Sequence, residues 1–165
     1  MATKQFIHWI ERRAGELRRL QKLGALDVLN PFELAAAMGV TVIKPTEVQG
    51  LSRRCLSELA GAGADHWSAG AITLPDGRAV VAMNPGHAPT RQRATLMEEL
   101  AHLHLGHQPS ELLAVDGQVF RTFKKSQETQ AYWVGAAALL PLAVLQHAQR
   151  APEYRGGCSG EGVRR

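Results

Sequence analysis

The sequence has little cysteine: among its 165 residues only Cys55 and Cys158 are cysteines, and they lie far apart in the chain. This pattern argues against a disulfide framework and against a zinc site built from thiolates. Long hydrophobic runs are also missing, because no apolar segment approaches the roughly 20 residues that a membrane-spanning helix needs. The N-terminus lacks the apolar core and cleavage site of a secretory signal. We therefore expect a cytoplasmic protein without a membrane partner.

Several functional signatures are absent as well. The chain contains no P-loop and no dinucleotide-binding fingerprint, and no Ser-His-Asp arrangement can be assigned. Its net charge of +4 would permit nucleic-acid contact. Much of this charge lies in the N-terminal segment, at Arg12, Arg13, Arg18 and Arg19. No interleaved aromatic residues, zinc finger or clear recognition helix accompanies them, so a solvated helix face is the favoured interpretation and a nucleic-acid partner is not indicated.

Length and composition predict one domain over residues 1–150. Hydrophobic residues make up 45% of the chain and charged residues 21%, which is ordinary for a globular protein. Residues 151–165, with the sequence APEYRGGCSGEGVRR, offer almost nothing to bury. We expect this tail to be disordered.

Hydrophobic periodicity and turn residues predict alternating helices and strands. Residues 50–66 give no clear pattern, and residues 108–126 read as a loop. Thr90 is the expected N-cap of the central helix, Gly106 its expected end, and Pro141 should end or kink the last helix. The predicted helices are 5–23, 31–39, 90–106 and 127–148, and the predicted strands are 40–45, 68–74 and 78–84, the last two forming a hairpin around Pro75-Asp76-Gly77.

The central helix carries a candidate metal site in the segment TLMEELAHLHLGH, residues 95–107. Glu98 and His102 are four residues apart, so both side chains lie on one helix face and can reach one metal ion. Glu99 projects beside them and could take a proton from a metal-activated water. The best candidate for a third ligand is Glu128, at the start of the following helix. The motif alone is common, however, and by itself it favours two solvent-facing glutamates and a half-buried histidine over a metal site.

The chemical type of the three candidate ligands influences which metal ion the site would prefer. Two carboxylates with one imidazole are harder ligands than two imidazoles with one carboxylate, so zinc affinity should fall while tolerance of manganese, iron or magnesium should rise. His104 and His107 are expected to add little, because they do not share the face of Glu98 and His102. His107, next to Gly106, is interpreted at least equally well as a cation at the helix C-terminus.

The order of motifs resembles the ImmA/IrrE family of metallopeptidases. RQRATLMEELAHLHLGH is similar to that family's R-x-R-f-T-l-a-H-E-l-g-H segment, and ETQAYWVGAAALLP to its second signature. NPFELAAAMGVTVI resembles the family's entry segment, and the hairpin ending in VAMNP matches the strand before its active helix. The similarity covers roughly residues 5–142. The first ligand position of the family's H-E-x-x-H is occupied here by Glu98.

The resemblance implies an α+β fold, a zincin-like minimal metallopeptidase domain with a small antiparallel-type sheet, an active-site helix and flanking helices. It implies a divalent metal, most simply zinc with manganese or iron as alternatives, with Glu99 as general base and Glu128 as third ligand. Members of the family cleave or regulate DNA-binding repressors, so a protein partner such as a helix-turn-helix repressor is expected.

Two functions remain open at this point, with the first slightly favoured. One is a metal-dependent endopeptidase, in which residues 78–84 could provide an edge strand for an extended substrate; the alternative for this strand is an ordinary sheet interior. The other is a catalytically impaired pseudo-peptidase that binds a regulatory protein.

Overall fold

The fold is an α+β arrangement of helices around one small sheet, as the sequence predicts. The computed structural model describes residues 3–48, 50–61, 63–74, 76–107, 112–115, 118–121 and 124–150. Its helices are α1 (Lys4–Leu20), α2 (Pro31–Ala37), α3 (Arg53–Ala60), α4 (Pro89–His104), α5 (Lys125–Leu139) and α6 (Leu142–Arg150), with 3-10 turns at Pro45–Glu47 and Ala64–His66. Its strands are β1 (Thr41–Ile43), β2 (Ala69–Thr73), β3 (Ala79–Met83), β4 (Leu112–Val115) and β5 (Gln118–Arg121). The tail predicted for residues 151–165 lies outside the described residues.

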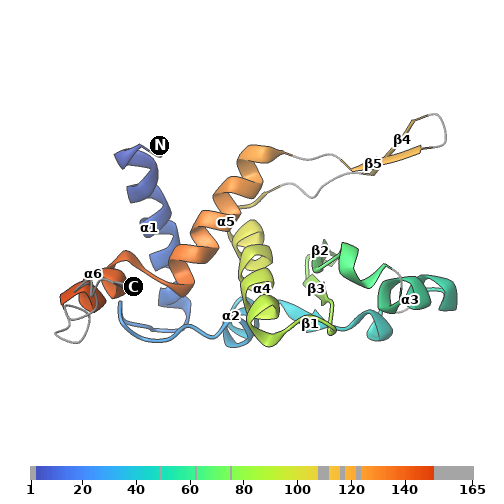
Figure 1. Ribbon diagram of the computed structural model, residues 1–165, viewed down its shortest axis with the longest axis horizontal. Coiled ribbons are helices and arrows are strands. Elements are labelled where there is room, and N and C mark those ends of the chain that lie inside the picture. Colours follow the sequence, from blue (N-terminus) through green and yellow to red (C-terminus); the bar gives the residue numbers. More distant parts are fainter. Residues whose placement is uncertain are drawn as a thin grey trace, which may run out of the picture.

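Helices α4 and α5 cross at the centre of the molecule (Figure 1). In that view α1 and α6 lie on one side of this pair, while the sheet and α3 lie on the other. Among the described residues, no single helix has the length and apolar character to cross a membrane; α5 and α6 meet that test only as a pair bent by 44°.

The helix ends follow the local sequence with one exception. Asn30 caps α2 by accepting a hydrogen bond from the Phe32 amide, with Pro31 in the first turn. The expected cap of α4 by Thr90 is wrong, since this helix begins at Pro89 after Ala88. Proline has no N–H, and its fixed φ suits the first helical position, so the helix can start there without a side-chain cap.

The three-stranded sheet has β3 in the middle. β2 pairs with β3 antiparallel, as the hairpin prediction requires, and β1 adds a parallel pairing in which Val42 lies opposite Val81. The sheet is therefore mixed. Because β3 has a partner on each side, residues 78–84 form the sheet interior, and the prediction of an edge strand there is wrong. β2 has no second strand partner among the described residues.

A second hairpin corrects the predicted loop. β4 and β5 pair antiparallel, with Leu112 opposite Arg121 and Val115 opposite Gln118. Asp116-Gly117 between two apolar runs is a strong sequence signal for a hairpin, and the loop prediction overlooks it. In Figure 1 the paired strands project away from the helices. Residues 50–66, which the sequence left open, contain α3 and the 3-10 turn at Ala64–His66.

The hydrophobic core lies between α4, α5 and α1. α4 buries Leu96 and Leu100 completely, and α5 buries Ala131 and Val134 completely. Leu17 of α1 joins the same cluster. The small alanine side chains of α5 allow it to pack closely against α4, and this packing brings the first turn of α5 beside the middle of α4.

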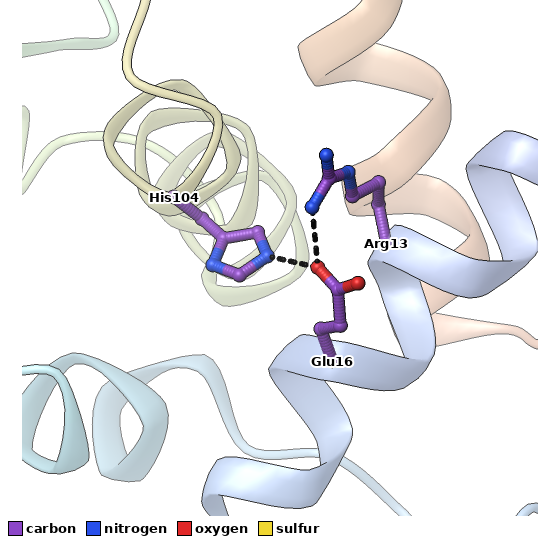
Figure 2. Close-up of polar contacts among 3 residues, drawn as sticks. All are labelled: Arg13, Glu16 and His104. Atoms are coloured by element: carbon purple, nitrogen blue, oxygen red, sulfur yellow. Dashed lines mark hydrogen bonds and ion pairs between the residues drawn. The ribbon is translucent and has the colours of Figure 1, made fainter.

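Polar contacts also tie α1 to α4. The Glu16 carboxylate lies 2.9 Å from Arg13 Nη1 and 3.1 Å from Nε2 of His104 (Figure 2). His104 therefore points towards α1 and away from the predicted metal site.

Arg18 departs from the solvated arginine face that the sequence predicts. Its side chain is buried and donates to the backbone oxygen of Ala138 at 2.8 Å, and also to the oxygens of Gly24 and Asp27. Arg18 thus holds the C-terminal end of α1 to α5 and to the following loop. It does not contribute to a basic surface.

Candidate metal centre

The structure brings together the three residues predicted as metal ligands. α4 presents Glu98 and His102 from successive turns, and Glu128 lies in the first turn of α5. One ligand atom from each residue lies within 4.8 Å of the other two, and His102 Nε2 is 3.4 Å from a Glu128 oxygen. All three side chains are half-buried. The arrangement could hold one metal ion with an open position for another ligand.

The electrostatics of the cluster fit a cation. Burial raises the pKa of Glu98 above its ordinary value, and the negative charge of Glu128 raises it further. Two carboxylates that repel one another in a half-buried site are stabilised when a positive ion lies between them. The carboxylate and imidazole donors are also ones that divalent transition metals accept.

A cavity of about 460 Å³ opens next to these three side chains. It runs from α4 and the start of α5 across to β2, and its lining includes Glu99. The candidate general base thus faces the same space as the candidate ligands.

The opposite wall of the cavity is built by residues 65–71, which also line it. Asn84, which is buried, holds this wall: its amide nitrogen donates to the backbone oxygens of Ala64 and Trp67. Arg91 of α4 reaches across and donates to Ser68 Oγ at 3.0 Å. The site therefore has one wall from the helices and one from the sheet.

His107 is the residue that the sequence interpretation misplaced. Although it lies beyond the helix, its Nδ1 is 3.0 Å from Nδ1 of His102, and its Nε2 is 3.1 Å from Oε1 of Gln130. Gly106 has a positive φ of 65° and reverses the chain at the helix end. Helix periodicity does not apply beyond this reversal, so His107 returns to the face of His102.

This α+β fold and the convergence of its acidic and imidazole side chains are those of a metallopeptidase-like domain. The family model described as the IrrE N-terminal-like domain, a peptidase family, matches residues 35–155. The chain belongs to this family, and the resemblance drawn from its motifs is confirmed. Comparison with curated proteins and with solved structures gives no significant match.

Proposed function

We propose that the protein is a metal-dependent endopeptidase in which Glu98, His102 and Glu128 hold the metal. The observation that carries this proposal is the convergence of the three ligand atoms within 4.8 Å of one another beside an open cavity. Family membership supports it, because the match to a peptidase family spans both helices that carry these residues. Zinc is the favoured metal, with manganese and iron as alternatives because two of the three donors are carboxylates.

A divalent cation in this site would polarise a peptide carbonyl and make water a stronger acid. Glu99 directly follows Glu98 in α4 and lines the cavity. We assign it the role of general base, which accepts the proton of the attacking water and passes it to the departing amine. Glu98, His102 and Glu128 orient the reacting groups by fixing the position of the cation.

β2 provides a place for an extended substrate. Residues 69–71 of β2 line the cavity, and the strand has one side without a partner among the described strands. An extended peptide adding to that side would form backbone hydrogen bonds and pass in front of Glu99. We propose that the substrate is a segment of a regulatory protein, such as a helix-turn-helix repressor, in keeping with the family resemblance.

Metal analysis combined with three variants, one of them a control, tests the proposal. We expect purified protein to bind close to one divalent ion per chain, measured by elemental analysis and titration calorimetry. Glu128→Ala should release the metal because a ligand is lost, whereas Glu58→Ala, on the exposed surface of α3, should retain it. Glu99→Gln should keep the metal but lose cleavage of a peptide library. Metal-free wild-type protein, or cleavage by Glu99→Gln at the wild-type rate, would contradict the proposal.

A non-catalytic role is the second candidate. The observation that favours it is Glu98, a carboxylate whose pKa is raised, at the position where the family motif has a histidine ligand. A pseudo-peptidase would bind its protein partner with equal affinity in the wild type and in Glu99→Gln, and neither form would cleave it. Turnover that disappears in Glu99→Gln would exclude this second candidate.

A further inference from the structure

We propose that His107 and Gln130 are positioning residues that set the tautomer of His102, so that its Nε2 presents a lone pair to a metal ion held between Glu98 and Glu128. This inference rests on the proposed metal site and adds two residues that act on it through His102. Neither belongs to the ligand cluster itself.

The backbone at the end of α4 places His107. The His107 amide donates to the His102 oxygen at 3.1 Å, and the Gly106 amide donates to the Leu103 oxygen at 3.2 Å. These two bonds, with the positive φ of Gly106, form a Schellman motif. The motif ties His107 to the residue that it contacts through its side chain, so the two imidazoles meet because of local backbone geometry.

The contact between the rings of His102 and His107 requires a proton on one of the two facing nitrogen atoms. The two Nδ1 atoms face one another at 3.0 Å, a distance that a hydrogen bond between neutral rings permits only when one Nδ1 carries a proton and the other does not. The centroids of the rings of His102 and His107 are 5.0 Å apart and the rings are inclined by 74°. They therefore meet in a T-shaped arrangement, with the two Nδ1 atoms facing one another, and do not stack.

Gln130 decides which ring carries that proton. Its Oε1 lies 3.1 Å from Nε2 of His107 and can only accept, so the His107 proton is at Nε2. Nδ1 of His107 is then an acceptor, and Nδ1–H of His102 donates to it. The remaining nitrogen of His102, Nε2, is left without a proton.

This lone pair on Nε2 faces the place where a cation would bind between the three side chains. Nε2 of His102 is the atom that lies 3.4 Å from Glu128 and belongs to the cluster with Glu98. A ring with its proton on Nε2 could not donate a lone pair to a metal there. The opposite orientation of the Gln130 amide would reverse the chain of donors and produce that unsuitable tautomer. Ligand histidines commonly need such a partner on their second nitrogen, and its loss typically weakens metal binding by about 10- to 100-fold.

Four variants separate this role from simple packing. His107→Phe keeps an aromatic ring but removes both nitrogens, while His107→Asn keeps an acceptor at the δ position. Gln130→Glu keeps the acceptor as a carboxylate, and Gln130→Leu removes it. Thr129→Glu, an exposed neighbour on α5, controls for the added negative charge. Thermal unfolding identifies any variant that does not fold.

Two measurements are made on each folded variant. Competition with a chromophoric chelator gives the zinc affinity, and long-range ¹⁵N NMR of the metal-free protein identifies the protonated nitrogen of His102. We expect wild type, His107→Asn and Gln130→Glu to carry the proton on Nδ1. His107→Phe should bind zinc about 10- to 100-fold more weakly and lose this tautomer preference. Gln130→Leu should likewise weaken zinc binding and reduce the preference for the Nδ1–H tautomer of His102.

The inference is overturned if His107→Phe retains the wild-type tautomer and zinc affinity, or if His107→Asn is as impaired as His107→Phe. It is also overturned if metal-free wild type carries the His102 proton on Nε2. Because the tautomer is read without metal, this result is independent of the proposed function. If the wild type binds no zinc but carries the His102 proton on Nδ1, the proposed metal site is wrong while the proposed hydrogen-bond chain from Gln130 through His107 to His102 still holds.

Discussion

Gly135 of α5 lies against the backbone of Met97 in α4, so closely that a Cβ atom at Gly135 would meet the Met97 carbonyl oxygen at 3.3 Å. The Met97 carbonyl carbon would lie at 3.4 Å from that Cβ and the amide nitrogen of Glu98 at 3.5 Å. Gly135 lies seven residues after Glu128, on the same face of α5. The close approach of the two helices therefore sets the distance between the candidate ligands of α4 and the carboxylate of α5.

We predict that Gly135→Ala destabilises the protein by about 1–3 kcal/mol, because the methyl group meets rigid backbone and forces the helices apart. Gly15→Ala is the matched control: its Cβ would only touch the end of the Arg19 side chain, at 3.6 Å. That substitution should stabilise α1 by about 0.5–1 kcal/mol. Urea denaturation of both variants measures the difference, and equal stabilities would show that the helix approach is not tight.

We predict that Glu98→His increases zinc affinity relative to manganese by roughly tenfold or more, because an imidazole is a softer donor than a carboxylate. The variant creates an H-E-x-x-H sequence in α4, with two imidazoles on one helix face. Glu98→Gln is the control, since it removes the charge without supplying a nitrogen donor. Chelator competition with each metal gives the ratio. An unchanged ratio in Glu98→His would mean that residue 98 does not contact the ion.

We predict that Arg18→Met lowers the free energy of unfolding by about 3 kcal/mol. The substitution leaves the backbone oxygens of Gly24, Asp27 and Ala138 without the donor that they now have. Arg19, the exposed neighbour on α1, is the control, and Arg19→Met should change stability by less than about 0.5 kcal/mol. Chemical denaturation compares the two, and similar effects would contradict the clamp that the structure assigns to Arg18.

We predict that the ionisation of Glu16 makes the free energy of unfolding depend on pH in the acidic range. The hydrogen bond from Arg13 lowers the pKa of Glu16, burial opposes this effect, and the hydrogen bond from His104 lowers the pKa further. A lowered folded-state pKa gives stability that is present above the ordinary value of 4.5 and is lost as the pH falls through the folded-state pKa. Because Glu16 is accessible to solvent, this contribution should stay below about 1 kcal/mol.

Urea denaturation between about pH 7 and pH 3 measures the Glu16 contribution. Glu16→Gln should be less stable than wild type at neutral pH and should lose less stability on acidification. Glu58→Gln, on the exposed surface of α3, should follow the wild-type curve. Parallel curves for wild type and Glu16→Gln would show that the contacts in Figure 2 do not hold α1 to α4 in solution.

Much of the site was predictable because its signals are local. The four-residue spacing of Glu98 and His102 places them on one helix face in any α-helix. The hairpin of β2 and β3 and the end of α4 shortly before Gly106 follow from turn chemistry. The position of His107 was also within reach, since a glycine that ends a helix in a Schellman motif turns the following residue back towards the last turn.

The sequence alone determined the α+β class, the family and the identity of the candidate ligands. Motif spacing and hydrophobic periodicity are properties of neighbouring residues in the chain, so they can be recognised without the tertiary structure. Tertiary structure decided that β3 lies inside the sheet, that Arg18 is buried and that Gln130 meets His107. Each of these depends on which surfaces of separate elements come into contact, and this is determined by packing over the whole core. The same packing of α5 against α4 brings Glu128 to the pair on α4, and so assembles a candidate metal centre from two distant segments.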